Sequence, residues 1–438
     1  MSSAKYTTSL FLPAQAAAET EATLVKWHVK AGDTFVKGGI LAEAESAKST
    51  FEFEAPCAGQ VIAILVSEGQ VTPFDKPVIE IETDDATVKR TAPARDVRDD
   101  GPGQAALAVA PKSRSVSIPI SILGVGGYLP KQVVRTKDLM AEFPDFTEEY
   151  MFGVTGIRER HWAVAGEKPS DMALAAAREA IKNSGMTPGD IHGIILSTTS
   201  PDVVMPSTSC IVAKGLGIRG IPCFDLNAAC SGWLYAILAA KGLIYTGVGK
   251  NILVIAADMQ SRTLDKKDRN TYFLFGDGAG ATVVSHTDTG HVIREGVLTA
   301  DPEGLHMARR EFPGYEVPAN SQGFDPWLRL DGKALFRFAT TSFASLIKRV
   351  VELSEWKSED VRWVVPHQAN GRIIKAAADR CGIPFERFFL NIDHVGNTSS
   401  ASIPLALVEL ERFLHKGDKI VMCTVGAGIT AAAVSLEW

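Results

Sequence analysis

The sequence lacks the long apolar run that a membrane-spanning helix needs. No stretch of its 438 residues approaches about 18 consecutive apolar side chains, and residues 1–8 lack the charged-then-apolar pattern of an export signal. The composition, 46% hydrophobic and 22% charged, is typical of a globular protein, and the length predicts two or three folded units. We therefore expect a cytoplasmic protein without membrane association.

Regularly spaced cysteines and an excess of positive charge are also missing. The six cysteines are scattered and form no Cys-x-x-Cys pair, which favours a reducing compartment over a disulfide framework and predicts no metal site. The net charge of −6 argues against nucleic acid as a partner, because a phosphate backbone requires a basic surface. Local basic patches that bind an acidic carrier protein are compatible with this charge.

Apolar periodicity disappears between residues 83 and 115. This segment is rich in Ala, Pro, Asp, Arg and Gly, and its composition predicts a flexible linker between a small N-terminal module, residues 1–82, and a large body. As disordered coil the linker would have a root-mean-square reach of roughly 30 Å. The module could then visit a nearby active site.

The module, residues 1–82, alternates polar and apolar residues in short segments such as 23–29 and 59–66, with glycines between them. This pattern predicts a small all-β sandwich or flattened barrel. The body instead alternates apolar strands with helical stretches, which predicts an α/β fold. Its two halves, residues 116–285 and 286–438, end in similar strand-turn-strand segments, so we expect an internal duplication.

Cys230 is the first candidate catalytic residue. It stands in the string Asp225–Gly232, where a strand is expected to end and a helix to begin. Free backbone amides and the positive end of the helix dipole would lower the pKa of the thiol and favour a nucleophilic thiolate. Taken alone, a free cysteine is more often a small buried hydrophobe, so this residue needs partners to count as a nucleophile.

His367 and Asn397 are candidates of the same kind. His367 follows an apolar strand, and Asn397 comes after Gly396 and before a predicted helix. Each alone is more simply explained as a satisfied polar residue at a strand end or a turn. Together with Cys230, however, they lie on the carboxyl side of strands, where open α/β sheets gather their sites. This shared placement favours one common site.

Longer strings carry a family resemblance over residues 116–438. Five of them occur in family order: Gly156–His161, Asn227–Gly232, Phe275–Ala281, Pro366–Asn370 and Gly396–Ser399. On these strings the body resembles β-ketoacyl-[acyl-carrier-protein] synthase III, a thiolase-superfamily enzyme. The resemblance implies a five-layered αβαβα thiolase fold built from two similar halves, usually in a homodimer.

The resemblance also implies a reaction. The Cys-His-Asn triad of the family corresponds to Cys230, His367 and Asn397, and its oxyanion hole to the backbone amides of Cys230 and Ala427. An acyl group on Cys230 would be joined, with decarboxylation and without a cofactor, to a malonyl thioester whose carbonyl is held by His367 and Asn397. The implied partners are acyl and malonyl thioesters and an acyl-carrier protein.

Several other positions bear on the substrates. Tyr150 replaces the tryptophan that contacts coenzyme A in the family and Val154 replaces a nearby arginine, so coenzyme A thioesters are expected to be poor donors. Arg372 and Arg380 keep the basic positions that contact a carrier protein. Met205 occupies a position that resembles the gate of the acyl pocket.

The N-terminal module, from residue 21 to 82, resembles a lipoyl or biotinyl carrier domain, with Lys48 at the hairpin tip where the prosthetic group is attached. The string Glu45–Ser49 lacks the Met-Lys-Met of biotin sites, which favours lipoyl. The simpler alternative is that Lys48 is a solvated lysine on a docking or folding module. Our hypothesis is that a lipoyl arm on Lys48 brings the acyl group to Cys230 as a thioester of dihydrolipoamide and so bypasses coenzyme A.

Two other functions stay open. A non-decarboxylating acyltransferase of the same fold would move the acyl group from Cys230 to an amine or alcohol, but an intact Asn397 argues against it, because that amide chiefly serves the enolate. The second alternative is a non-catalytic partner subunit or binding module, and the retention of all three triad residues argues against it.

Overall fold

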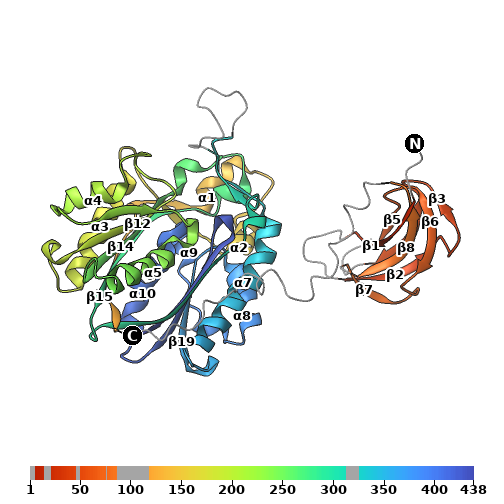
Figure 1. Ribbon diagram of the computed structural model, residues 1–438. Coiled ribbons are helices and arrows are strands. Elements are labelled where there is room, and N and C mark those ends of the chain that lie inside the picture. Colours follow the sequence, from red (N-terminus) through yellow and green to blue (C-terminus); the bar gives the residue numbers. More distant parts are fainter. Residues whose placement is uncertain (1–4, 14–20, 46–49, 75, 86–117, 312–324) are drawn as a thin grey trace. The chain divides into compact units, whose positions relative to one another are not determined.

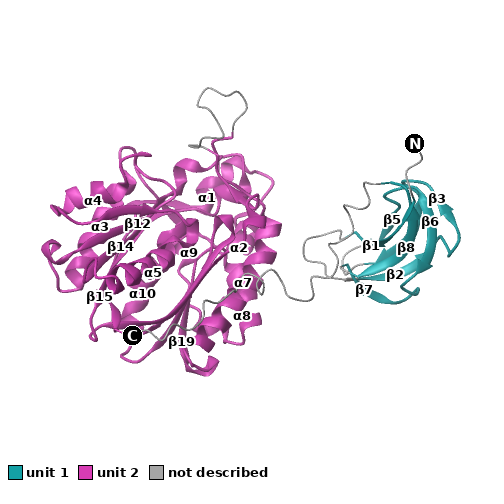
Figure 2. Ribbon diagram, in the orientation of Figure 1, with its two compact units in different colours: residues 1–101 teal, residues 102–438 magenta. Residues whose placement is uncertain are grey.

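Two compact units make up the chain, residues 1–101 and 102–438 (Figure 2). The structure, a computed structural model, describes residues 5–13, 21–45, 50–74, 76–85, 118–311 and 325–438. The expected linker, residues 83–115, falls almost entirely outside these ranges. No helix within the described ranges is long and apolar enough to cross a membrane.

The N-terminal unit is a sandwich of two antiparallel four-stranded sheets, as its alternating pattern predicts. Their strand orders are β1-β8-β6-β3 and β5-β4-β2-β7. Inward-facing residues such as Leu24, Leu41 and Ile79 are fully buried between the sheets. The strands are β1 (Tyr6–Phe11), β2 (Glu21–Trp27), β3 (Thr34–Phe35), β4 (Ile40–Glu45), β5 (Thr50–Glu54), β6 (Gly59–Ile64), β7 (Val71–Pro73) and β8 (Pro77–Thr83).

One nine-stranded sheet runs through the body, in the order β13-β12-β14-β15-β9-β16-β21-β20-β19 (Figure 1). Two short two-stranded sheets, β10-β11 and β17-β18, accompany it. The strands are β9 (Ile120–Tyr128), β10 (Gln132–Arg135), β11 (Glu159–Trp162), β12 (Gly193–Ser197), β13 (Cys223–Leu226), β14 (Asn251–Met259), β15 (Asp277–His286), β16 (His291–Ala300), β17 (Ala308–Arg309), β18 (Arg329–Leu330), β19 (Val361–Pro366), β20 (Lys419–Val425) and β21 (Thr430–Glu437).

The sheet contains the same arrangement twice, which confirms the expected duplication. In the first half β12 runs parallel to β14, which pairs antiparallel with β15, which pairs antiparallel with β9. In the second half β19, β20, β21 and β16 repeat this order and these directions. The halves join where His291 and Val292 of β16 pair with Ile122 and Ser121 of β9.

Three hydrophobic clusters define five layers. Helices α3 and α4 cover the first half of the sheet, α7 covers the second half and packs against α8, and α5 and α10 lie between the two halves. The expected αβαβα thiolase fold is therefore confirmed. The helices are α1 (Thr136–Leu139), α2 (Glu148–Thr155), α3 (Pro169–Asn183), α4 (Thr208–Leu216), α5 (Gly232–Tyr245), α6 (Arg269–Tyr272), α7 (Gly332–Leu353), α8 (Gly371–Cys381), α9 (Ile392–Val395) and α10 (Ser402–Leu410).

The two central helices are apolar around most of their circumference. Trp233, Leu234 and Ile237 of α5 are fully buried, as are Leu407 and Leu410 of α10. A helix that is hydrophobic on all sides is stable only inside a protein. The starts of α5 and α10 are therefore held in the interior, and this position fixes the candidate site.

Candidate active site

Cys230 lies between strand β13 and helix α5, in the short 3-10 turn Ala229–Ser231. Ala229, just before it, has a left-handed φ of 47°. The Cys230 Sγ atom lies 3.6 Å from Oγ of Ser399, which begins the matching 3-10 turn before α10. The sulfur of one half of the body thus faces the helix start of the other half.

Burial dominates the electrostatics of Cys230. The residue keeps partial exposure to solvent, but its sulfur is surrounded by protein atoms, and this burial raises the pKa of the thiol to about 12. The hydrogen bond with Ser399 acts in the opposite direction and is weaker. The expectation that the helix start lowers this pKa is wrong for the resting site, because lost hydration outweighs the helix dipole. The resting sulfur is a thiol.

His367 follows β19 directly and is only 1% exposed. Its Nδ1 atom lies 2.6 Å from Oγ of Ser402, and its backbone N–H donates to the carbonyl of Cys423. Burial lowers the pKa of His367 to about 3. The imidazole is therefore neutral at physiological pH and can donate one hydrogen bond.

Asn397 is fixed through both its backbone and its side chain. Its backbone N–H donates to Leu274 O, and its carbonyl accepts from the N–H of Gly276, each at 2.9 Å. The side-chain Oδ1 accepts from the N–H of Ser399 at 2.9 Å, and Nδ2 donates to Ala369 O at 3.3 Å. The amide orientation is thus set by one donor and one acceptor.

Short contacts connect Cys230 and Asn397 and reach the backbone next to His367. Ser399 touches both the sulfur of Cys230 and the side chain of Asn397. Asn397 in turn contacts the carbonyl of Ala369, two residues after His367. The structure therefore brings Cys230, His367 and Asn397 into one neighbourhood.

The turn that contains Ala427 packs against Cys230. A Cβ atom at Gly426 would lie 2.9 Å from the backbone nitrogen of Cys230 and 3.0 Å from that of Ser231, so only glycine allows this approach. The hydroxyl of Thr424 donates to the carbonyl of Cys230 at 3.1 Å. The backbone of the Ala427 turn and that of Cys230 are therefore held side by side.

Backbone strain is concentrated in these turns. Four described residues other than glycine have a left-handed φ, and three of them, Ala229, Ser399 and Ile429, lie in the turns that hold Cys230, follow Asn397 and contain Ala427. Each such residue costs of order 1–3 kcal/mol and persists only where the surrounding structure enforces it. Such strain is typical of functional sites.

The fully buried side chain of Asp258 joins two of the turns that surround the site. Asp258, near the end of β14, accepts hydrogen bonds from the backbone N–H and hydroxyl of Thr199, and from the same groups of Ser400. Asp258 thereby ties the turn after β12 to the turn that precedes α10. Asp258, Ser399 and Ser402 were not predicted as site residues. The hydroxyl-rich string 398–402, next to Asn397, could have indicated the two serines.

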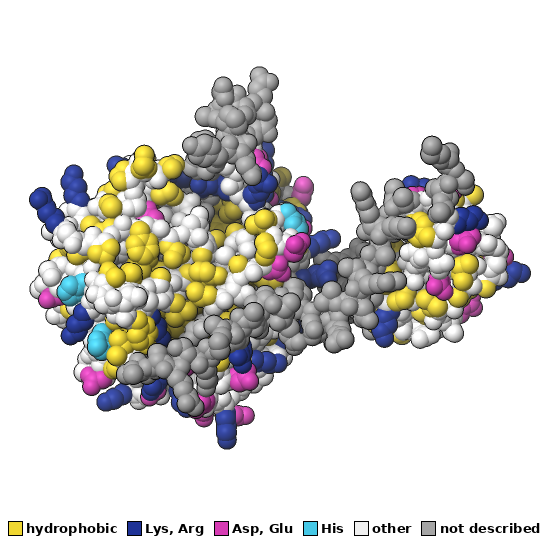
Figure 3. Space-filling model, viewed as in Figure 1, with side chains coloured by type: hydrophobic (Ala, Val, Ile, Leu, Met, Phe, Trp, Pro, Cys, Tyr) yellow, Lys and Arg dark blue, Asp and Glu magenta, His cyan; other side chains and the backbone are white. Residues whose placement is uncertain are grey.

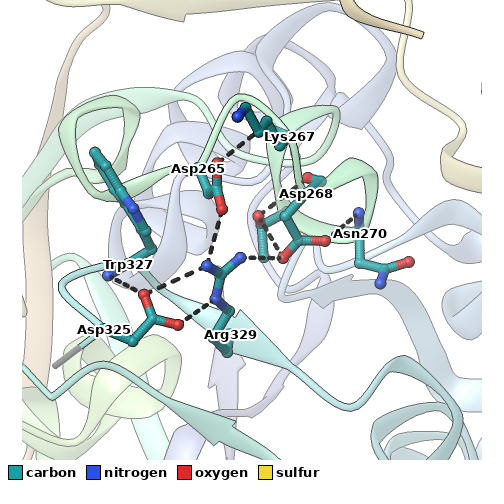
Figure 4. Close-up of polar contacts among 8 residues, drawn as sticks. Asp265, Lys267, Asp268, Asn270, Asp325, Trp327 and Arg329 are labelled. Atoms are coloured by element: carbon teal, nitrogen blue, oxygen red, sulfur yellow. Dashed lines mark hydrogen bonds and ion pairs between the residues drawn. The ribbon is translucent and has the colours of Figure 1, made fainter. Parts of the chain in front are cut away.

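One arginine and three aspartates form a polar cluster beside helix α6 (Figure 4). Arg329 of β18 binds Asp325 and contacts Asp265 at 2.8 Å and Asp268 at 3.4 Å, and the hydrogen bond with Asp325 is the main cause of its raised pKa. Asp268 also caps α6. The segment after α6 provides the backbone groups that hold Asn397, so the cluster anchors that segment.

Tyr150 lies on α2, is 50% exposed and stacks on Phe146 with ring centroids 5.3 Å apart. The guanidinium of Arg269 lies 4.7 Å from the centroid of the Phe146 ring. This surface therefore keeps a cation near its aromatic rings, although Val154 stands where the family has arginine. The carbonyl of Val154 accepts a hydrogen bond from Asn370, at the start of α8.

The other candidate residues lie on the surface. Arg372 and Arg380 are exposed on α8, which packs against α2, and Arg380 donates to the hydroxyl of Thr341 at 3.0 Å. Met205 is 85% exposed. Within the described part of the chain these side chains make no hydrogen bond or ion pair with Cys230, and Lys48 lies outside that part. No group of three His, Cys, Asp or Glu side chains there is placed to hold a metal ion.

Three family patterns match the sequence. 3-Oxoacyl-[acyl-carrier-protein (ACP)] synthase III matches residues 224–302, and the C-terminal part of the same family matches residues 351–438. The pattern described as biotin-requiring enzyme matches residues 8–81. The matches fall on both halves of the body and on the N-terminal unit.

Curated relatives and solved structures agree with these matches. The β-ketoacyl-[acyl-carrier-protein] synthase III of Clostridium acetobutylicum is 38% identical over 328 residues, which is 73% of this chain and 98% of that protein. The enzyme of that name from Neisseria meningitidis serogroup B is 39% identical over 320 residues, 72% of this chain and 98% of that protein.

Among solved structures, 3-oxoacyl-[acyl-carrier-protein] synthase III from Aquifex aeolicus VF5 is 38% identical, with a TM-score of 0.68 over 73% of this chain and 100% of that one. The priming β-ketosynthase from the R1128 polyketide biosynthetic pathway is 34% identical, with a TM-score of 0.69 over 75% and 98% of the two chains.

The buried neutral state of His367 predicts a loss of stability in acid. Unfolded His367 takes up a proton near pH 6.5, whereas folded His367 does so only near pH 3, so stability falls as the pH drops from 6.5 toward 3. At pH 5 this effect amounts to about 2 kcal/mol. We expect His367→Gln to lose less unfolding free energy than the wild type between pH 7.5 and pH 5, measured by denaturant titration. Parallel pH curves for the two proteins would contradict this.

Proposed function

The chain belongs to the β-ketoacyl-[acyl-carrier-protein] synthase III family, and we propose that it condenses an acyl group held on Cys230 with a malonyl thioester, releasing CO₂ and a β-ketoacyl thioester. The observation that carries this proposal is the set of short contacts that join Cys230 to Asn397 through Ser399, and Asn397 to the backbone carbonyl two residues after His367. A surface patch or a lone buried cysteine would not require such contacts.

In the first step the sulfur of Cys230 attacks the carbonyl carbon of an acyl thioester. The new S–C bond forms, the donor thiol leaves, and the proton of Cys230 passes to the departing sulfur. This transfer is required because burial holds the thiol pKa near 12. We assign the backbone N–H groups of Cys230 and Ala427 to the oxygen that becomes negative, since their two turns pack against each other.

In the second step a malonyl thioester binds with its carbonyl oxygen facing His367 and Asn397. One N–H of the Asn397 side-chain amide donates a hydrogen bond to Ala369 O, and we assign its second N–H to the substrate carbonyl. The bond to the carboxylate breaks, CO₂ leaves, and the resulting enolate attacks the acyl carbon. Cys230 departs as a thiolate and takes up a proton from solvent. Neutral donors suit this step because they stabilise the enolate without a permanent charge.

Substitution of Asn397 tests this assignment. We expect Asn397→Ala to form the acyl adduct on Cys230, seen by intact mass, but to release CO₂ from carboxyl-labelled malonyl carrier protein about 10²–10³-fold more slowly, since one donor to the enolate is lost. Cys230→Ser should lose the thioester adduct. Asn183→Ala, which removes a side-chain amide bonded to Val125 O, is a matched control. Product formation without CO₂ release would instead indicate acyl transfer to an amine or alcohol.

We propose that the N-terminal unit carries a lipoyl group on Lys48. The unit has the fold and family pattern of a biotin or lipoyl domain, and β4 and β5 pair so that Glu45 lies opposite Thr50. Lys48 is the only lysine among the four residues that connect them. A lipoyl group attached there would supply, when reduced, a thiol able to carry an acyl group as a thioester. Cys230 would then accept that acyl group as it accepts any other.

Intact-mass measurement tests the modification. Protein made in a lipoate-proficient host should gain the mass of one lipoyl group, and Lys48→Arg should abolish the gain, whereas Lys37→Arg, on the same unit, should not. The gain of a biotinyl group, or an unmodified chain with full activity in Lys48→Arg, would contradict the proposal.

We further propose that an acyl-carrier protein docks near α8 and that the chain acts in the cytoplasm. Arg372 and Arg380 give α8 exposed cations, which suit an acidic partner. All six cysteines are free, as suits a reducing compartment.

We also propose that the chain forms a homodimer. Val203, Val204 and Met205 are consecutive exposed hydrophobic residues, 47%, 79% and 85% exposed, and such runs often mark protein interfaces. Hydrophobic side chains also gather in the middle of the visible face of the body (Figure 3). The sheet edge at β13 is unpaired within the described chain.

A charge at the exposed run tests the dimer. We expect light scattering to give twice the chain mass for the wild type and a shift toward the monomer mass for Met205→Glu, because a buried unpaired carboxylate destabilises an interface. Val36→Glu, at a 71% exposed residue of the N-terminal unit, is the control and should remain dimeric. A monomeric wild type would refute the proposal.

A further inference from the structure

Ser402 is a buried residue in direct contact with the candidate imidazole. It is the first residue of α10 and is 1% exposed. Its Oγ atom lies 2.6 Å from Nδ1 of His367. The same oxygen accepts a longer hydrogen bond, 3.4 Å, from the backbone N–H of Gln368.

Burial of Ser402 favours one direction for this hydrogen bond. Within the described ranges, Nδ1 of His367 is the one acceptor in hydrogen-bond distance of the Ser402 hydroxyl. A hydroxyl has a single proton and can accept as well as donate. If the oxygen also accepted from Nδ1, the buried hydroxyl proton would have no acceptor among the described residues, so the arrangement that satisfies every group has the Ser402 hydroxyl donating to Nδ1. A neutral imidazole that accepts at Nδ1 carries its own proton on Nε2.

The backbone at the end of β19, on either side of His367, is held by the side chain of Gln368. The side-chain amide of Gln368 donates to the carbonyls of Pro366 and Phe389, at 2.8 and 3.2 Å, and its Oε1 accepts from the N–H of Asn391. The backbone beside the imidazole therefore cannot shift freely toward another partner. Ser402 is the side chain that contacts Nδ1.

The two halves of the body supply the hydroxyl near the central helix start from different elements. Gly232 begins α5 as Ser402 begins α10, each after a 3-10 turn with a left-handed first residue. A Cβ atom at Gly232 would lie 1.8 Å from Oγ of Ser197, the last residue of β12. β12 is the counterpart of β19, which His367 follows. The hydroxyl thus comes from the strand in one half and from the helix in the other.

We propose that Ser402 is a positioning residue that holds His367 in the tautomer with the proton on Nε2, so that this nitrogen donates to the malonyl thioester carbonyl. The inference rests on the proposed function for the role of His367. It adds the residue that selects the tautomer and predicts which half of the reaction depends on it. Acylation of Cys230 needs no donor from His367 and should not depend on Ser402.

Nitrogen NMR of the full chain labelled with 15N-histidine reads the tautomer directly. The His367 signals are assigned by their loss in His367→Gln. We expect the wild type to show a protonated Nε2 and an unprotonated Nδ1, and Ser402→Ala to show a mixture of both tautomers or the opposite one. Ser402→Ala with an unchanged Nε2–H tautomer would overturn the inference.

Half-reactions separate positioning from a merely structural role. We expect Ser402→Ala to acylate Cys230 within about twofold of the wild type and to release CO₂ from malonyl carrier protein about 10- to 100-fold more slowly, since part of the population lacks the donor. Ser402→Thr keeps a hydroxyl and should restore most of the rate. Ser285→Ala is the control for the loss of a buried serine. It removes a buried hydroxyl of β15 that is hydrogen-bonded to Asn251 of β14.

These outcomes test the tautomer of His367 separately from the proposed condensation. Equal loss of acylation and CO₂ release in Ser402→Ala would indicate a structural role and overturn the inference. A wild type that releases no CO₂, yet shows the tautomer change in Ser402→Ala, would refute the proposed condensation and leave the tautomer assignment standing.

Discussion

The contact between two helix-starting turns, Ala229–Ser231 and Ser399–Ala401, is the constraint on which the site depends. Each half of the duplicated body contributes one of them, and each leads into a helix that is buried between the two halves of the sheet. Burial of these helices supplies the free energy that keeps Ala229 and Ser399 in strained backbone conformations. In these conformations the two turns lie against each other. The sulfur of Cys230 therefore contacts Ser399, two residues after Asn397.

Burial then sets the charge state of the site. It raises the pKa of Cys230 and lowers that of His367, so both side chains are neutral at rest. Asp258 is buried nearby, and its oxygens accept four hydrogen bonds from Thr199 and Ser400. With Cys230 and His367 both neutral, the site holds donors toward a substrate oxygen and stabilises negative charge when the reaction creates it. This explains why the tautomer of His367 matters more than its pKa.

Local sequence patterns predicted an α/β body with an internal duplication and marked the three candidate residues, whereas the five-layered fold and the triad were implied by the family resemblance. The duplication, the α/β alternation and the strand-to-helix junctions at Cys230 and His367 depend on periodicity along the chain, which the sequence displays. The pKa of Cys230 was predicted in the wrong direction, because a helix start is visible in a sequence and the burial of a sulfur between two halves is not. Ser402 and Arg329 were missed for a similar reason: Ser402 contacts His367, 35 residues away, and Arg329 contacts Asp265, 64 residues away.

The fused N-terminal unit supports the proposed lipoyl-borne acyl donor more strongly than the substitutions at Tyr150 and Val154 do. Phe146 and Tyr150 still stack, and Arg269 places a cation on that stack, so the replacement of arginine by Val154 does not by itself exclude coenzyme A thioesters. A donor attached to Lys48 would belong to the same chain as Cys230, and a tethered donor is typically present at an effective concentration of about millimolar, whatever its affinity for the surface. A tethered donor needs no strong clamp. The fused carrier unit is therefore a better reason to expect lipoyl-borne acyl groups than any single substitution in the body.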